Sequence, residues 1–250
     1  MIIKAIKLKT LLLSVLAVFL CGYIVSQKAA TVFKVGNREI PIYSVERDDN
    51  RIALTFNCAW SDGDIDRIIE TLKKHNADAT FFIVGEWAEK YPDSLRKLSD
   101  AGFEIGNHSY NHAHYNKMSK ADILKDMEKG DSAIENVIGK KPYLFRAAYG
   151  EYNNDTVTAC DESGRMYIQW SLDSIDYKAG SPDDILNRLL PHTKSGDIIL
   201  LHSGTEHTAD ALDTLLSELS KKYTFSNISD MVYKENYKID GTGRQYNYAK

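Results

Sequence analysis

Residues 103–112 read FEIGNHSYNH, and this stretch is the most informative one for both the fold and the site. The apolar start of this stretch predicts a buried β-strand over residues 103–106, directly before His108 and His112. Two imidazoles four residues apart fit one face of a helical turn, close enough to bind one metal ion. Taken alone, the pair fits a polar loop with surface histidines equally well. The choice between a metal site and a surface loop therefore depends on what lies at the ends of the neighbouring strands.

Short apolar, β-rich runs alternate with amphipathic helical stretches from about residue 50 onward. The predicted strands are 52–56, 79–84, 103–106, 143–145, 167–170, 198–201 and a weaker one at 223–225. Ser119 with Asp122, and Ser181 before Pro182, are typical of helix starts. Strands that alternate with helices predict a mainly parallel sheet, open or closed into a barrel.

Composition supports one soluble globular domain with appendages. The chain has 250 residues, of which 43% are hydrophobic and 26% charged, and its net charge is -4. That charge leaves no basic footprint, so we predict no nucleic-acid partner, and nothing in the sequence predicts a protein partner. The three cysteines, Cys21, Cys58 and Cys160, are too few for a disulfide framework.

The N-terminus differs from the rest of the chain. Lys4, Lys7 and Lys9 precede an apolar run over residues 11–25, which is typical of a signal peptide or an uncleaved signal anchor. We favour a retained anchor, with cleavage near Ala29 as the alternative. Positive charges before the run place the following domain outside the cytoplasm, either attached to the membrane by this single span or secreted.

The sequence divides into four parts. They are a signal peptide or anchor at 1–30, an extended preface at 31–50 with a turn at 35–38, the main domain at 51–228, and a polar, loosely held tail at 229–250. Length and composition show no internal repeat or long linker.

Polar side chains recur where the predicted strands end. In strand order they are Asn57, His108, Arg146, Asp173 with Asp176, and His202. In α/β folds the carboxyl ends of parallel strands meet at one edge, where ligands bind. Five such positions predict one converging site, and they favour the metal-binding interpretation of the histidine pair.

A carboxylate would complete a metal site of two histidines and one acid. The candidates are Asp62, Asp64 and Asp66, and we favour Asp64, although Asp62 and Asp64 fit helix N-caps equally well. His202, at the end of a buried strand, fits either a hydrogen-bonded structural histidine or a general acid tuned by a nearby carboxylate.

Five ordered motifs together resemble the NodB-type polysaccharide deacetylases, carbohydrate esterase family four, over roughly residues 50–228. The motifs are Thr55-Phe56-Asn57-Cys58-Ala59-Trp60, His108-Ser109-Tyr110-Asn111-His112, Arg146-Ala147-Ala148-Tyr149-Gly150, Asp173-Ser174-Ile175-Asp176-Tyr177 and Ile199-Leu200-Leu201-His202. The first is closest to a Trp-containing variant of the family pattern. The resemblance implies a NodB homology domain, that is, an α/β fold forming a distorted (β/α) barrel of about seven parallel strands.

The resemblance also implies a metal-dependent hydrolase acting on N-acetylated polysaccharide, with peptidoglycan or a related cell-envelope glycan as substrate. A divalent ion, Zn²⁺ or else Co²⁺, Mn²⁺ or Ni²⁺, would be held by His108, His112 and a carboxylate, for which Asp64 is our assignment.

The remaining motif residues receive roles by the same resemblance. Position 57 holds the base, Arg146 orients it, and His202 protonates the leaving amine with Asp176 setting its charge. Tyr149, through its backbone, and Asp173 belong to the oxyanion and substrate part of the site.

Two departures from the family pattern bear on turnover. Asn57 stands where the family has an acidic base, and an amide cannot accept a proton at neutral pH. Cys58 stands where the family has a metal-binding Asp, so it is either a thiolate ligand or a small buried residue. The other motif residues are intact, so we predict an active deacetylase; they are His108, His112, Arg146, Asp176 and His202. The two departures favour the alternative, a catalytically impaired glycan-binding or structural envelope protein.

Overall fold

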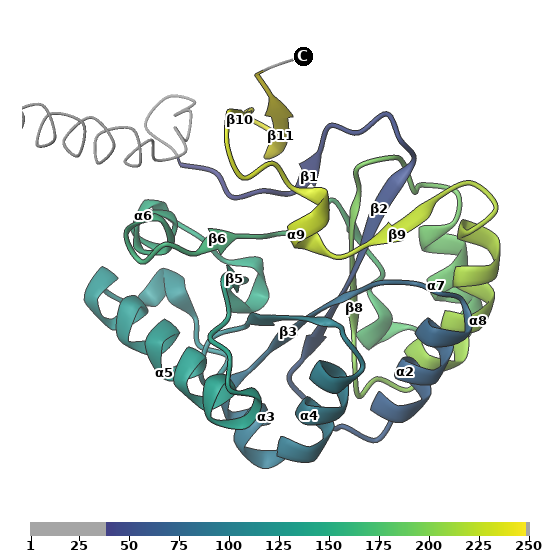
Figure 1. Cartoon of the computed structure of the whole chain (residues 1–250), viewed down its shortest axis with the longest axis horizontal. Helices are drawn as coiled ribbons and strands as arrows, with labels where there is room; N and C mark the ends of the chain where they lie inside the picture. The colour runs from purple at the N-terminus through teal and green to yellow at the C-terminus, as the bar shows by residue number, and fades with distance from the viewer. Residues whose placement is uncertain (1–38, 249–250) are drawn as a thin grey trace, which may run out of the picture.

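A computed structural model describes residues 39–248 (Figure 1). The predicted signal segment at 1–30 and the turn at 35–38 lie outside the described residues. Across 39–248, none of the helices combines the length and the apolar character needed to cross a membrane.

The main sheet is parallel throughout. Its strands are β2 (Arg51–Cys58), β3 (Thr80–Ile83), β4 (Glu104–Asn107), β5 (Leu144–Phe145), β6 (Met166–Tyr167), β7 (Leu172–Asp173), β8 (Ile198–His202) and β9 (Thr224–Ser226). The order is β6-β5-β4-β3-β2-β8-β7, and β9 pairs with the first residues of β2. The sheet curls into a half-barrel, so the predicted distorted (β/α) barrel is confirmed.

Strand β2 lies at the centre and separates two apolar cores. Because side chains alternate along a strand, Ile52, Leu54, Phe56 and Cys58 all pack into the larger core under the outer helices. The opposite face contributes Ala53 to a second, smaller core. At the carboxyl end of β2, this opposite face presents polar groups instead.

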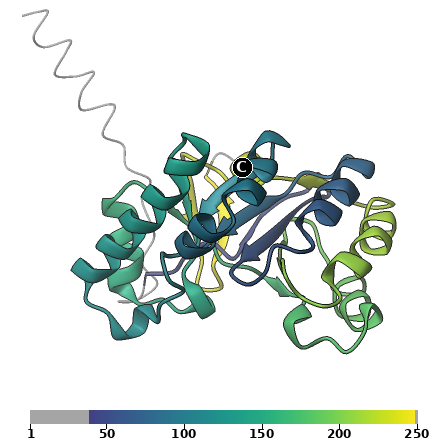
Figure 2. The same ribbon diagram turned by 90° about the horizontal axis from the view of Figure 1, so that it is seen from below.

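Helices cover the outside of the curled sheet. They are α2 (Ile65–Lys74), α3 (Gly85–Lys90), α4 (Pro92–Asp100), α5 (Lys120–Ile138), α6 (Asn154–Glu162), α7 (Pro182–Leu189) and α8 (Thr208–Leu219). The short helix α9 (Ile228–Met231) instead packs into the second core. Figure 2 shows α5 and α6, in teal, at one end of the sheet and α7 and α8, in green and yellow, at the other. Ser119 and Ser181 cap α5 and α7, as predicted.

The C-terminal tail is ordered as far as residue 248, so the prediction of a loosely held tail is wrong for this part. Strands β10 (Tyr237–Ile239) and β11 (Arg244–Asn247) form a hairpin, and β11 pairs with β1 (Ser44–Val45) of the extended preface (Figure 1). Tyr237 and Ile239 are buried in the second core, and that burial holds the hairpin in place. The apolar pattern of the tail is too short to predict this from sequence.

We predict that Gly196→Ala destabilises the fold more than Gly164→Ala does. Both glycines have left-handed backbones, with φ of +87° and +70°, so alanine costs about 1–2 kcal/mol at either position. A Cβ on Gly196 would also lie 1.8 Å from the carbonyl oxygen of Val45, whereas Gly164 has open space around it. The extra clash should add roughly 1–3 kcal/mol in urea unfolding. Equal losses in the two variants would contradict the close approach of β1 to the sheet.

Candidate active site

The predicted polar residues do meet at the carboxyl edge of the sheet. Asn57 and His202 are paired neighbours on β2 and β8, and His108 follows β4. Arg146 follows β5 and is completely buried, and Asp176 lies in the short turn after β7. The convergence predicted from the strand ends is therefore present in the structure.

The surroundings of His108 favour a neutral imidazole in which one nitrogen is unpaired. Its Nδ1 lies 2.8 Å from the carbonyl oxygen of Arg146, and because a carbonyl can only accept, Nδ1 carries the proton. Nε2 is buried and has no hydrogen-bond partner in the part of the chain that the structure describes. Burial and the neighbouring His112 lower the pKa of His108 well below its ordinary value. An orphaned basic nitrogen in this setting is what a metal ligand requires.

His112 lies close to His108, but the backbone between them does not have the predicted helical conformation. Residues 108–112 form no helical turn; Ser109 and His112 instead have left-handed backbones, with φ of 69° and 58°. The two imidazole centroids are 5.1 Å apart. Burial, with His202 and His114 nearby, lowers the pKa of His112 to about 4, so this ring is neutral as well. The pair fits a divalent cation as two nitrogen ligands.

The acidic candidates for a third ligand have other partners. Both carboxylate oxygens of Asp64 accept from the backbone N–H of Gly204, at 2.8 and 2.9 Å. Asp62 accepts from the hydroxyl of Ser94 on α4, and Asp66 forms an exposed ion pair with a lysine of that helix. Asp64 stands at the N-cap position of α2 but does not cap it with its side chain. Between residues 39 and 248, no three His, Cys, Asp or Glu side chains are grouped closely enough to hold one metal ion.

Cys58 is a core residue in this structure. It belongs to the larger apolar cluster and is fully buried. Burial raises the pKa of the Cys58 thiol to about 12, which keeps it protonated at neutral pH. Of the two interpretations of Cys58, the small buried residue is the one that the structure supports.

Asn57 occupies the position of the expected base and makes the contact expected of an acid. Its side-chain oxygen accepts from Arg146 at 3.0 Å, and Thr55 accepts from the same guanidinium nitrogen at 2.9 Å. The other acceptors are the carbonyls of Ile168 and Gln169. None of these groups is anionic, and burial lowers the pKa of Arg146 to about 9. Among residues 39–248, no anionic group hydrogen-bonds to this buried cation.

His202 and Asp176 form a buried dyad. The Nδ1 of His202 lies 2.7 Å from one carboxylate oxygen of Asp176. The other oxygen accepts from the backbone N–H of His202 at 2.6 Å and from the hydroxyl of Thr208 at 2.7 Å. The backbone N–H of Tyr177 is a fourth donor to this carboxylate, at 3.0 Å. Because an ionised carboxylate can only accept, the Nδ1 of His202 is protonated and the ring orientation is set.

Tyr149 and Asp173 take different places in the site. Tyr149 is 57% exposed, has a left-handed φ of 59°, and contacts the ring of His112 edge to face at 4.5 Å. It stacks on the ring of His114, which lies in the loop before residue 115. Asp173 accepts from the backbone N–H of Ile175 and so shapes the turn that carries the dyad.

Sequence reasoning missed three supporting residues: Thr55, Gln169 and Thr208. Thr55 and Gln169 satisfy the buried guanidinium, and Thr208 satisfies the carboxylate of the dyad. Thr55 stands within the first motif, two positions before Asn57 on the same face of β2, and this spacing is the one signal that could have found it.

Comparison with known proteins gives the family. The model of the family described as polysaccharide deacetylase matches residues 44–168, half of the chain. The chain belongs to the polysaccharide deacetylase family. The match covers the first three of the five motifs and the strands β2 to β6 that carry them.

Relatives in this family include two named enzymes. A peptidoglycan-N-acetylglucosamine deacetylase of Bacillus cereus is 33% identical over 68% of this chain, and PgdA of Listeria monocytogenes, with the same activity in its name, is 32% identical over 83%. The chain spans 64% and 43% of the length of these two relatives.

A solved relative departs from the named enzymes. The structure of a CE4 family pseudoenzyme from Bacillus anthracis is similar with a TM-score of 0.75 and 31% identity, covering 82% of this chain and 72% of that one. A mutant of that protein, described as having restored enzymatic activity, has the same TM-score and 33% identity over 78% and 72% of the two chains. Named enzymes and a pseudoenzyme thus share this fold.

We predict that Asn57→Asp stabilises the protein at neutral pH. A carboxylate at this position would pair with the buried Arg146 cation, with an expected gain of about 1–3 kcal/mol in urea unfolding. The arginine would hold the folded-state pKa of the new acid below its unfolded value of about 4. The gain should therefore be complete above that value and be lost as the pH falls through the folded pKa.

Asn187→Asp is the matched control, because Asn187 is exposed on α7 and the substitution adds the same charge. It should change stability by about 0.5 kcal/mol or less. If Asn57→Asp gave no more than this control, Arg146 would not lack a counter-charge.

We also predict that His112 makes stability depend on pH. The pKa of this residue is about 4 in the folded chain and about 6.5 in the unfolded chain, so between these values the unfolded chain binds the extra proton. Stability should therefore fall as the pH is lowered from about 6.5 toward 4. His112→Asn, which suits a left-handed backbone, should flatten this slope.

The measurement is urea unfolding between pH 7 and pH 4.5 in the presence of a chelator. Because His112 is only half-buried, solvent screening will reduce the effect. Identical slopes in the parent and in His112→Asn would show that the ring is not desolvated in the folded chain.

Proposed function

We propose that this chain is a metal-dependent hydrolase that removes acetyl groups from N-acetylated cell-envelope glycan, with peptidoglycan as the substrate. The observation that carries the proposal is the meeting of the neutral His108 and His112 pair with the His202–Asp176 dyad at one edge of the sheet. The names of the peptidoglycan deacetylases to which the chain is similar support the same class of substrate.

The side chains divide the chemistry between them. His108 and His112 would hold a divalent ion, which when bound polarises the acetyl carbonyl and lowers the pKa of a water molecule. His202 faces the site with Nε2 and, once protonated there, donates that proton to the departing sugar amine. Asp176 stabilises the positive charge that the imidazole carries before this transfer, and it keeps Nδ1 protonated afterwards. The ring of Tyr149 contacts that of His112, and its backbone is left-handed. By the family resemblance this backbone would help to hold the oxyanion.

Asn57 favours a second candidate function. The amide holds the contact with Arg146 but cannot take a proton from water, and no other acid hydrogen-bonds to that guanidinium in the described part of the chain. A catalytically impaired relative that binds glycan would keep this geometry without turnover. The similarity to a solved pseudoenzyme, and to its mutant with restored activity, supports this candidate.

Acetate release separates the two candidates. The full chain is incubated with N-acetylglucosamine oligomers and with purified peptidoglycan, with added Zn²⁺ or Co²⁺. We expect the parent to release acetate, and His108→Ala to lose at least about 100-fold in rate, since it removes a ligand nitrogen. Asn57→Asp should gain about 10²–10⁴-fold, the usual contribution of a positioned base.

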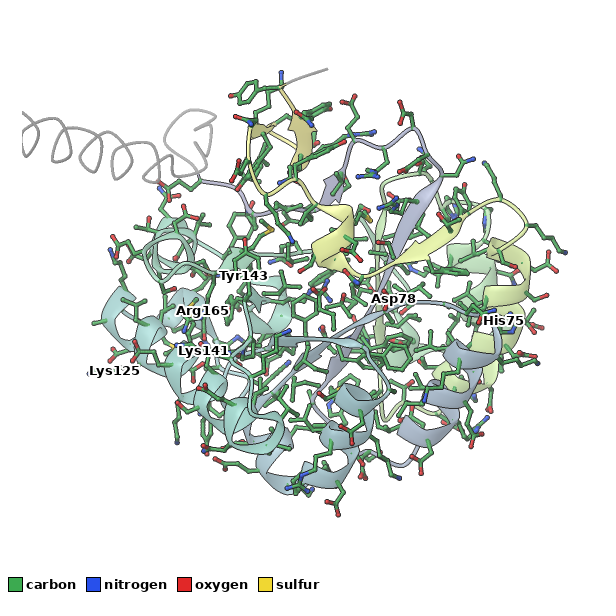
Figure 3. All side chains as sticks on the ribbon, in the orientation of Figure 1. His75, Asp78, Lys125, Lys141, Tyr143 and Arg165 are labelled. Atoms are coloured by element: carbon green, nitrogen blue, oxygen red, sulfur yellow. The ribbon has the colours of Figure 1, made fainter. Side chains whose placement is uncertain are left out.

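His75→Ala is the control for the histidine variant, because His75 lies on the surface at the end of α2, paired with Asp213 (Figure 3). It should keep the rate of the parent. No acetate from any substrate with the parent, together with activity in Asn57→Asp, would overturn the hydrolase proposal in favour of the glycan-binding one. Full activity in His108→Ala would refute the metal-binding role.

A further inference from the structure

Exposed aromatic side chains gather around the candidate site. Five large hydrophobic residues within 39–248 are exposed: Trp60, Tyr143, Tyr149, Tyr177 and Tyr248. Three of them, Trp60, Tyr149 and Tyr177, contact a histidine of the site. Exposed apolar surface is expensive to maintain and marks sites of interaction when it is clustered.

Trp60 lies beside His202, the proposed general acid. Its ring centroid lies 5.1 Å from that of His202, with 35° between the planes, and Tyr177 approaches the same imidazole edge to face at 5.4 Å. The two aromatic rings are 6.4 Å apart, and each keeps almost half of its surface exposed. Trp60 and Tyr177 therefore form a continuous aromatic surface beside His202.

The loop that carries Trp60 is fixed at two points. Asp62 is bonded to Ser94 of α4 at 2.6 Å, and Asp64 holds the backbone N–H of Gly204, two residues after His202. A Cβ on Gly204 would lie 2.5 Å from the backbone of Ser61, so this glycine allows the loop to pack directly on the end of β8. Trp60 is thus pre-organised above the dyad, although its own side chain is not buried there.

We propose that Trp60, with Tyr177 beside it, is a stacking platform for a pyranose ring of the N-acetylated glycan. This proposal rests on the proposed function for its ligand class. The face of a pyranose ring presents several C–H groups, and the negative face of an indole attracts their partial positive charge while apolar area is buried. A ring held on Trp60 lies next to the imidazole that would protonate its amine. Pre-organisation keeps the entropy cost of binding low.

The test is glycan binding, which needs no turnover. The full-length parent, Trp60→Ala and Trp60→Phe are titrated calorimetrically with the hexamer of N-acetylglucosamine and are co-sedimented with purified peptidoglycan. We expect Trp60→Ala to bind about tenfold more weakly and Trp60→Phe, which retains an aromatic face, to stay within about threefold of the parent. Tryptophan emission of the parent should also shift on binding, and this shift should be absent in Trp60→Phe.

Tyr143→Ala is the matched control. Tyr143 is 45% exposed, as is Trp60, but it precedes β5 at the amino end of the sheet, near Lys141 and Arg165 (Figure 3). Its removal should leave binding unchanged, and thermal unfolding of each variant checks that it folds.

The results separate this proposal from the proposed function. Parent-like binding by Trp60→Ala, or no glycan binding by the parent, would overturn the platform. Loss of binding in Trp60→Ala without acetate release by the parent would leave the platform standing and refute the hydrolase. Acetate release by the parent, together with parent-like binding by Trp60→Ala, would support the hydrolase and overturn the platform.

Discussion

The buried guanidinium of Arg146 constrains more of this structure than any other single group. It donates to Thr55 and Asn57 on β2 and to the carbonyls of Ile168 and Gln169 beyond β6. An aromatic ring of β3 covers it at 4.0 Å. Since a buried cation is tolerated only when its donors are satisfied, these segments are confined to one mutual arrangement. The curl of the sheet and the position of the site depend on that arrangement.

Arg146 also orients His108, through its backbone carbonyl oxygen. The carbonyl oxygen of Arg146 fixes the proton of His108 on Nδ1, and this leaves Nε2 free toward the site. Asn57 touches the guanidinium but not this carbonyl. An amide at position 57 therefore removes a proton acceptor while the geometry of His108 is preserved. Asn57 and His108 contact different parts of Arg146, the guanidinium and the carbonyl. The histidine pair can therefore stay in place although position 57 carries no acid.

The convergence of the site could be predicted from sequence because it follows from parallel strands alone. Polar residues at successive strand ends must share one edge, and Asn57, His108 and His202 do so. The conformation of residues 108–112 could not be predicted, since a spacing of four residues suits a helical turn as well as a loop with two left-handed residues. The order of the tail was equally hidden, because it depends on burial against a core formed by distant strands.

The partner of Asp64 shows the same limit and has a consequence for function. The sequence marks an acid after the first strand, but its contact with Gly204 joins residues 140 positions apart. That contact holds the loop of Trp60 over His202. The two aromatic side chains, Trp60 and Tyr177, follow β2 and β7 and lie against His202. The Arg146 guanidinium is bonded to a different set of groups, on β2 and after β6. In the proposed function, the surface that binds glycan is therefore separate from the group that would accept the proton. An active hydrolase and an impaired binding protein would present the same aromatic surface to the glycan.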